Sequence, residues 1–163
     1  MSKTWLISDT HFGHKNIIEY TGRPFQTVKE MDDTIITNWN AVVKSNDVIL
    51  HLGDFALGNL EDQQSYLKQL NGIKKLVMGN HDRLKVKDYY DMGFAEVYRY
   101  PIIIENIIFS HKPLDSLIIG SLYNVHGHIH EKQSPFTNHL NISVEHTNYS
   151  PISLNWVKKK LVG

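Results

Sequence analysis

Short apolar runs in this chain repeatedly end at polar residues of the types that bind metal ions. Six runs are typical of β-strands, and they span residues 4–8, 47–52, 75–78, 102–110, 122–125 and 140–144. The first five runs end at Asp9, Gly53–Asp54, Gly79–Asn80, His111 and His126–Gly127–His128. This recurrence restricts the fold more than any single motif does, because one architecture has to bring all of these strand ends together.

Helical periodicity separates the runs in the first half of the chain. The predicted helices span residues 28–44, 59–70, 86–92 and 153–161. Alternating strands and helices predict a parallel sheet, while a turn at Glu105–Asn106 predicts a hairpin and an antiparallel portion. The expected fold class is therefore α/β, with ligands bound at the carboxyl ends of the strands.

Length and composition exclude several classes of protein. The 163 residues suit one domain. The 17 basic and 17 acidic residues give no overall attraction to nucleic acid or to a membrane, although a local basic patch is still possible. Without cysteine there is no thiolate metal site and no cysteine nucleophile. No stretch approaches the roughly 20 apolar residues that cross a bilayer, and no signal peptide is visible, so a soluble cytoplasmic protein without a membrane partner is expected. Oligomeric state is not predicted.

Each polar motif has an ordinary explanation when it is taken alone. Asp-x-His is a frequent loop sequence, Gly-Asp and Gly-Asn are common turns, and a lone histidine before Lys-Pro is unremarkable. Gly-His-x-His is more specific, because an extended segment places both imidazoles on one side. All five segments at strand ends nevertheless predict a metal site made of Asp9, His11, Asp54, Asn80, His111, His128 and His130.

These residue types suit a pair of divalent cations. Two cations about 3.5–4 Å apart can clamp a phosphoryl group and share a hydroxide formed from water. A carboxylate is the natural bridge between them, while imidazoles and an amide fill the remaining positions. Because only two of the candidate ligands are anionic, two cations would leave about two positive charges, which suits an anionic phosphoester.

The order of these motifs resembles that of the calcineurin-like metallophosphoesterase superfamily. The stretch SDTHFGHKNII, the sequence GRPF at 22–25 and the sequence HLGDFA are similar to those of a compact subgroup found in bacteria and their phages. The resemblance implies a β-sandwich of two mixed sheets flanked by helices, formed by one domain over residues 1–163. It also implies Mn²⁺ as the metal, with Fe, Zn, Co or Ni as alternatives.

The same resemblance assigns roles to individual residues. Asp9, His11 and His130 would hold one metal, Asn80, His111 and His128 the other, and Asp54 would bridge the two. A metal-bridging hydroxide would attack phosphorus in line. His81 would protonate the leaving oxygen or steady the phosphoryl group.

The substrate is expected to be a small phosphodiester or a nucleotide-type molecule. Residues 55–58, Phe-Ala-Leu-Gly, lack the Asp and Arg that follow this Gly-Asp in the superfamily's protein phosphatases, and the short chain leaves the site open. Two related activities stay possible. One is a nuclease, for which Arg83, Lys85, Lys87 and Lys112 would bind the strand, and the other is a phosphomonoesterase. A metal-bound interaction module without catalysis is the alternative of another class.

Other polar residues near the motifs have less specific roles. His14, Arg23 and Arg83 are candidates for contact with substrate phosphate, although His14 could equally cap a following helical turn. His51 and His126 are expected to be core histidines or supports for metal ligands. His139 and His146 are expected at surface or sheet positions.

Overall fold

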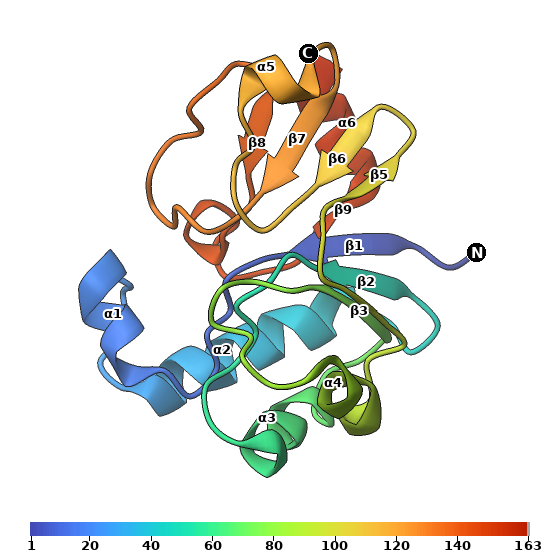
Figure 1. The fold of residues 1–163 in the computed structure, drawn as a ribbon. Helices are drawn as coiled ribbons and strands as arrows, with labels where there is room; N and C mark the ends of the chain where they lie inside the picture. The colour runs from blue at the N-terminus through green and yellow to red at the C-terminus, as the bar shows by residue number, and fades with distance from the viewer. Residues whose placement is uncertain (163) are drawn as a thin grey trace.

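Two mixed β-sheets pack against one another in the computed structural model, which describes residues 1–162 (Figure 1). The first sheet has the strand order β4-β3-β2-β1-β9 and the second the order β5-β6-β7-β8. The strands of the first sheet are β1 Thr4–Ile7, β2 Val48–His51, β3 Ile73–Val77, β4 Glu96–Tyr98 and β9 Ile152–Ser153. Those of the second are β5 Ile102–Ile104, β6 Ile107–Phe109, β7 Tyr123–His126 and β8 His139–Asn141.

Each sheet combines parallel strands with one antiparallel edge strand. Strands β1 to β4 are parallel, and β9 pairs antiparallel with β1. Strands β6, β7 and β8 are parallel, and β5 forms the expected hairpin with β6. Glu105 makes that turn in the left-handed region, with a φ of 56°. This arrangement confirms the predicted α/β fold of two mixed sheets flanked by helices.

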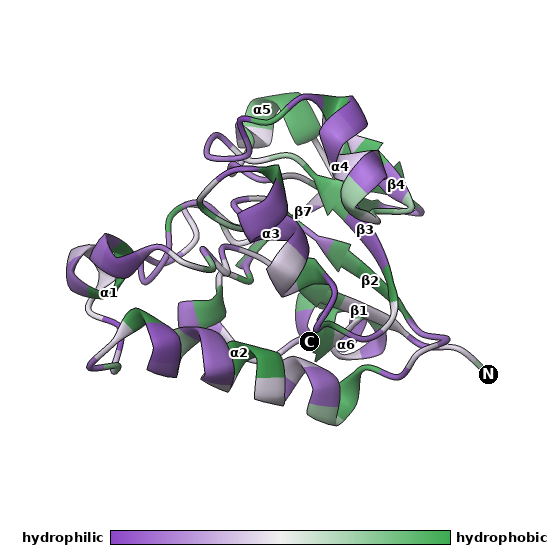
Figure 2. Cartoon of the chain, turned by 90° about the horizontal axis from the view of Figure 1, so that it is seen from below, coloured by the Kyte–Doolittle hydropathy of each residue, from purple (hydrophilic) through white to green (hydrophobic). Residues whose placement is uncertain are grey.

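Helices cover the outer face of the first sheet. The helical segments are α1 Lys15–Thr21, α2 Val28–Val42, α3 Leu60–Leu67, α4 Val86–Met92, α5 Ser116–Ile119, the 3₁₀ turn η1 Val144–His146 and α6 Leu154–Val162. The Thr27 side chain accepts a hydrogen bond from the Glu30 N–H and so begins α2, whose buried face carries Met31, Ile35 and Trp39. In both Figure 1 and Figure 2, α1 stands apart from the sheets at one end of the molecule.

Two apolar clusters hold the layers together. One fills the space between the sheets, with Leu6 and Leu50 from the first sheet and Phe109 and Val125 from the second. The other lies between the first sheet and helices α2, α3 and α4. No helix in the described part of the chain is both long enough and apolar enough to cross a bilayer.

The elements that the sequence did not predict are short. They are α1, β4, α5 and β9, and the last has two residues fixed only by pairing with β1. The third strand begins at Ile73, two residues before the predicted start. The predicted strand at 140–144 is wrong beyond Asn141, because Ser143 forms only an isolated bridge with Ser8 and Val144 begins η1.

We predict that Trp39→Ala lowers the free energy of unfolding by about 3–5 kcal/mol. Trp39 is 0% exposed, and its indole N–H donates to the Asn71 carbonyl at 3.0 Å. Urea unfolding followed by circular dichroism would measure the change. Trp156→Ala is the control, because Trp156 is 45% exposed and should cost less than about 1 kcal/mol. Equal losses from the two variants would contradict the assigned core.

Candidate metal centre

Both sheets contribute side chains to the candidate metal centre. Asp9, Asp54 and Asn80 lie just beyond β1, β2 and β3 of the first sheet, whereas His111 and His128 lie just beyond β6 and β7 of the second. Backbone hydrogen bonds tie neighbouring strand ends together. Asp9 N–H donates to Gly53 at 3.0 Å, and Gly127 N–H donates to His111 at 2.9 Å. Between the sheets, His128 N–H donates to Asp9 Oδ2 at 2.9 Å, so the strand ends of both sheets meet at one place.

The loops pack so closely that two positions have no room for a side chain. A Cβ on Gly79 would lie 2.2 Å from the Asp54 carboxylate. A Cβ on Gly127 would lie 2.0 Å from the Ser8 hydroxyl and 2.1 Å from the Asp9 carboxylate. The glycines of these motifs are thus required by the approach of the loops and not only by turn geometry.

Buried hydrogen bonds to Asp82 join the ends of β2 and β3. Its carboxylate accepts from the backbone N–H of Asp54 at 2.8 Å, Phe55 at 3.0 Å and Gly79 at 2.7 Å. Burial raises the pKa of Asp82 to about 6 even though these donors favour its charged form. Asp82 therefore sets the relative position of Asp54 and Asn80.

The backbone at the site is strained. Left-handed φ angles cost of order 1–3 kcal/mol each for residues other than glycine and persist only where the surroundings enforce them. Five candidate ligands have such angles: Asp9 (60°), His11 (51°), Asp54 (57°), His128 (69°) and His130 (51°). Strain concentrated in this way is typical of a functional site.

The first ligand group consists of Asp9, His11 and His130, whose ligand atoms lie within 4.8 Å of one another. One Asp9 oxygen, Oδ2, accepts hydrogen bonds from the Ser8 hydroxyl at 2.6 Å and the His128 N–H at 2.9 Å. The other oxygen, Oδ1, and His11 Nε2 are buried without a hydrogen-bond partner among residues 1–162, and lie 3.9 Å apart. Unpaired buried acceptors of this kind are costly, so a cation fits between them.

The second ligand group consists of Asp54, His111 and His128, again within 4.8 Å. His111 Nδ1 donates to the Leu52 carbonyl at 2.8 Å, which leaves Nε2 free to bind a metal. That Nε2 lies 2.9 Å from Asn80 Oδ1 and 3.2 Å from His128 Nδ1. The sequence-predicted Asn80 therefore joins this group.

Asp54 lies between the two groups. Its Oδ2 is 3.5 Å from His11 Nε2 in the first group and 3.3 Å from His111 Nε2 in the second. Its other oxygen accepts the His81 backbone N–H at 2.8 Å. One carboxylate oxygen is thus within reach of both groups, and the donor set fits two divalent cations with nitrogen and oxygen ligands.

Arg23 and Glu145 contact the residues of the first ligand group and hold them in place. Arg23 donates to the carbonyls of Asp9 at 2.7 Å and Thr10 at 3.0 Å, and pairs with Glu145 at 2.7 Å. Glu145 also accepts from His130 Nδ1 at 3.3 Å, which leaves His130 Nε2 facing Asp9. Because the Arg23 side chain is 0% exposed, the expected contact with a substrate phosphate is corrected to a contact with the ligand loop. Glu145 was missed because no motif surrounds it.

The other predicted residues divide into those near the groups and those away from them. The His81 and His14 rings each lie 5.4 Å from the His11 ring between centroids. His14 is the N-cap residue of α1, but its side chain makes no capping hydrogen bond. Arg83 is exposed and contributes to neither ligand group.

The remaining histidines have separate positions. His51 is buried and shares a hydrogen bond of 2.9 Å with the Thr10 hydroxyl, beside a ligand loop. His126 lies 3.1 Å from the Ser134 hydroxyl and in ring contact with His139 on β8. His146 is exposed and lies 3.0 Å from the Lys132 carbonyl.

Charge and burial shift the titration of the candidate ligands in different directions. Burial alone would lower the pKa of His111, but its hydrogen bond to Asp54 and the charges of Asp9 and Asp54 outweigh burial and raise it to about 9. Burial lowers the pKa of His128 to about 4, and the charge of His111 adds to this. Burial raises the pKa of Asp9, whereas His111 and other donors hold the pKa of Asp54 below its usual range despite burial. Without metal, the His111 ring is therefore in its protonated, positively charged form at neutral pH.

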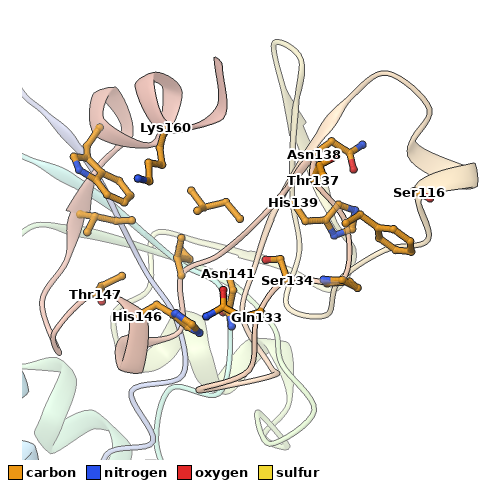
Figure 3. Close-up of a pocket in the computed structure, with 16 residues that line it drawn as sticks. Ser116, Gln133, Ser134, Thr137, Asn138, His139, Asn141, His146, Thr147 and Lys160 are labelled. Carbon is orange, nitrogen blue, oxygen red and sulfur yellow. The ribbon is translucent and has the colours of Figure 1, made fainter. Parts of the chain in front are cut away.

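A large cavity lies away from both ligand groups. It has a volume of about 800 Å³ and is lined by α6, β8 and the segment 133–138. Figure 3 shows Lys160 on one side of it and Ser116, Asn138 and His139 on the other. None of the candidate ligands lines this cavity, so size alone does not locate the site.

Comparison with known proteins gives one family. The family model of calcineurin-like phosphoesterases matches residues 2–162. The uncharacterized protein MJ1445 of Methanocaldococcus jannaschii is 38% identical, over 98% of this chain and 91% of its own length. The gene 66 protein of mycobacterium phage L5 is 36% identical, over 50% of this chain and 41% of its own length.

Two solved structures are similar to this one. The protein of unknown function AQ665 from Aquifex aeolicus has a TM-score of 0.78 and 31% identity, and the match covers 98% of this chain and 99% of that one. The Pseudomonas putida nuclease MPE has a TM-score of 0.52 and 20% identity, over 78% of this chain and 61% of that one. At that identity the nuclease shares the fold and nothing finer is concluded from it.

We predict that metal binding releases a proton and strengthens as the pH rises toward about 9. A protonated imidazole cannot bind a cation, so below the raised pKa of His111 the metal has to displace its proton. Calorimetric titration of Mn²⁺ at pH 7, in buffers of different ionisation enthalpy, should give about one proton released at this group. Affinity that does not change between pH 7 and about 9 would contradict the assignment.

We predict that Glu145→Gln weakens binding of one Mn²⁺ by about 10- to 100-fold, the usual effect of removing the partner of a ligand histidine. The amide cannot fix the His130 tautomer as the carboxylate does. Equilibrium dialysis would measure both affinities. Glu131→Gln removes the same charge from an exposed neighbour of His130 and should leave both affinities within about twofold. Equal weakening by the two variants would point to overall charge instead.

Proposed function

Because this chain belongs to the calcineurin-like phosphoesterase family, we propose that it is a phosphodiesterase that works with two divalent metal ions. The family is metal-dependent and acts on phosphoester bonds, and two candidate metal groups lie side by side in this chain. Mn²⁺ is the proposed metal, since nitrogen and oxygen ligands without thiolate accept it along with Fe, Co, Ni or Zn.

One observation carries the proposal. The buried Asp9 Oδ1 and His11 Nε2 have no hydrogen-bond partner among residues 1–162, and His11 Nε2 lies 3.5 Å from an Asp54 oxygen that is 3.3 Å from His111 Nε2. A site without cations would leave these groups unpaired at a cost of about 1–3 kcal/mol each. Two cations held by these residues, with Asp54 shared between the two groups, would satisfy the unpaired atoms.

The chain's own residues then divide the work of hydrolysis. When bound, the cations supply an activated water-derived nucleophile and neutralise charge on the phosphoryl group. His81 lies beside His11, and its backbone N–H is held by Asp54, so its ring can give a proton to the leaving oxygen. Arg23 and Glu145 hold Asp9 and His130 of the first group in position without touching the substrate.

A diester is preferred to a phosphoprotein because the position after Asp54 offers no arginine. Phe55 and Ala56 are buried there and pack into the core of the first sheet. A nuclease is the second candidate, since nucleic acid is itself a phosphodiester and a nuclease of Pseudomonas putida has this fold. A phosphomonoesterase or a non-catalytic metal-bound module is the outcome if diesters are not cleaved.

We predict that Asp54→Asn abolishes both activity and tight metal binding, because it removes the shared carboxylate. His81→Ala should lower kcat on unactivated diesters by about 10²- to 10⁴-fold and spare the metals, with a smaller loss on p-nitrophenyl esters that leave without a proton. An Mn²⁺-loaded panel of monoesters, diesters, nucleotides and nucleic acids would measure the rates, and metal analysis would measure occupancy.

The matched control is His146→Ala, which removes an exposed histidine outside both ligand groups. It should leave rates within about twofold of those of the unmodified chain. If His81→Ala cleaves activated and unactivated esters at unmodified rates, the role given to His81 is wrong. If no ester on the panel is cleaved by the loaded protein, the non-catalytic module is favoured.

A further inference from the structure

Two hollows border the candidate metal centre. The first, about 440 Å³, is lined by His11, His81, His130 and Tyr20, among others. The second, about 220 Å³, is lined by Asn80, His111, Arg99 and Tyr100, among others. They meet at the ligands, because His128 in the first lies 3.2 Å from His111 in the second.

This geometry suits a substrate with two arms. A phosphodiester carries one substituent on each side of phosphorus, whereas a monoester carries only one. With phosphorus at the metal centre, the arms of a diester would occupy one hollow each. A monoester would leave one hollow empty.

An exposed tyrosine borders each hollow. Tyr20 on α1 is 70% exposed, and its ring meets the His14 ring edge-on at 6.4 Å. Tyr100, between β4 and β5, is 78% exposed. A tyrosine face stacks on a nucleobase at about 1–3 kcal/mol per base. The two rings lie where the substituents of a diester would extend.

Charge differs between the hollows. The second hollow contains Arg99 and Lys112 and has no acidic residue in its lining. Neither cation forms an ion pair within residues 1–162. The first hollow has one cation, Lys132, balanced by Glu131. Arg99 and Lys112 therefore suit a substrate whose arm in the second hollow carries further phosphates. A small diester has no such phosphates.

From this juxtaposition we infer that the substrate is a single-stranded nucleic acid, which crosses the metal centre with one base stacked on Tyr20 and another on Tyr100. This inference rests on the proposed function. Arg99 and Lys112 bind the phosphates that follow on the side of the second hollow. A duplex is excluded as the bound form, because bases paired in a helix cannot stack on protein rings.

The test compares two substrates of the Mn²⁺-loaded chain, a single-stranded 12-mer oligonucleotide and methyl p-nitrophenyl phosphate. Tyr20→Ala and Tyr100→Ala should each lower the ratio of the two kcat/KM values by about 5- to 150-fold, the equivalent of one base stack. The Arg99→Ala/Lys112→Ala pair should reduce the salt slope of oligonucleotide cleavage by about 1.4, at about 0.7 per phosphate contact.

Two variants serve as matched controls. Tyr90→Ala removes a tyrosine of α4 that is 47% exposed, and Lys68→Ala removes an exposed cation at the C-terminal end of α3. Neither residue lines a hollow, so the substrate ratio and the salt slope should stay unchanged. An effect of the controls as large as that of the test variants would overturn the inference.

Further outcomes separate this inference from the proposed function. The chain could cleave the small diester while neither tyrosine variant changes the ratio of the two kcat/KM values. That result would overturn the inferred single-stranded substrate and leave the proposed phosphodiesterase activity intact. Equal cleavage of duplex and single strand also overturns it. If neither substrate is cleaved, the proposed function fails. The inference is then tested by binding of the labelled 12-mer, measured by fluorescence anisotropy. Binding that is unchanged in the tyrosine variants would overturn the inference.

Discussion

The hydrogen bonds that Asp82 accepts from the loops after β2 and β3 determine where the candidate metal ligands lie. Three backbone N–H groups, those of Asp54, Phe55 and Gly79, converge on this one buried carboxylate. Without it each N–H would be buried and unpaired, at about 1–3 kcal/mol apiece, and the loops would separate. Asp54 could then no longer lie within 3.5 Å of His11 and within 3.3 Å of His111 at once. The site therefore depends on a residue that need not touch metal or substrate.

The candidate metal centre has strained backbone angles and unbalanced buried charges, and folding without metal does not explain why they are kept. Left-handed backbone angles cluster at Asp9, His11 and His130, where Arg23 donates to the Asp9 carbonyl and Glu145 accepts from His130 Nδ1. Burial acts against charge on Asp9, and the proton on His111 partly offsets the two carboxylates. A pair of cations would replace that proton and pair the orphaned atoms. Cation binding would then offset part of the energetic cost of these loops.

The sequence predicted the polar strand ends well because each depends on local pattern. The apolar runs at 4–8 and 47–52 and the helix at 28–44 are regular enough to identify, and their ends bring Asp9 and Asp54 together. The two-sheet arrangement came from family resemblance, since alternation alone predicts only a parallel sheet with an added hairpin. The short strands β4 and β9 have too few residues for periodicity. Arg23 was misplaced, and Glu145 was missed, because their pairing joins positions 122 residues apart with no motif around Glu145.

Each ligand group draws on both sheets. The first combines Asp9 and His11 after β1 with His130 after β7, and the second combines Asp54 and Asn80 with His111 and His128. A cation in the first group would link positions 121 residues apart, Asp9 and His130, and one in the second group positions 74 residues apart, Asp54 and His128, as a disulfide does in chains that contain cysteine. This chain has none. Chelation should therefore loosen the sandwich, because bound cations would add a second link between layers that the apolar cluster already joins.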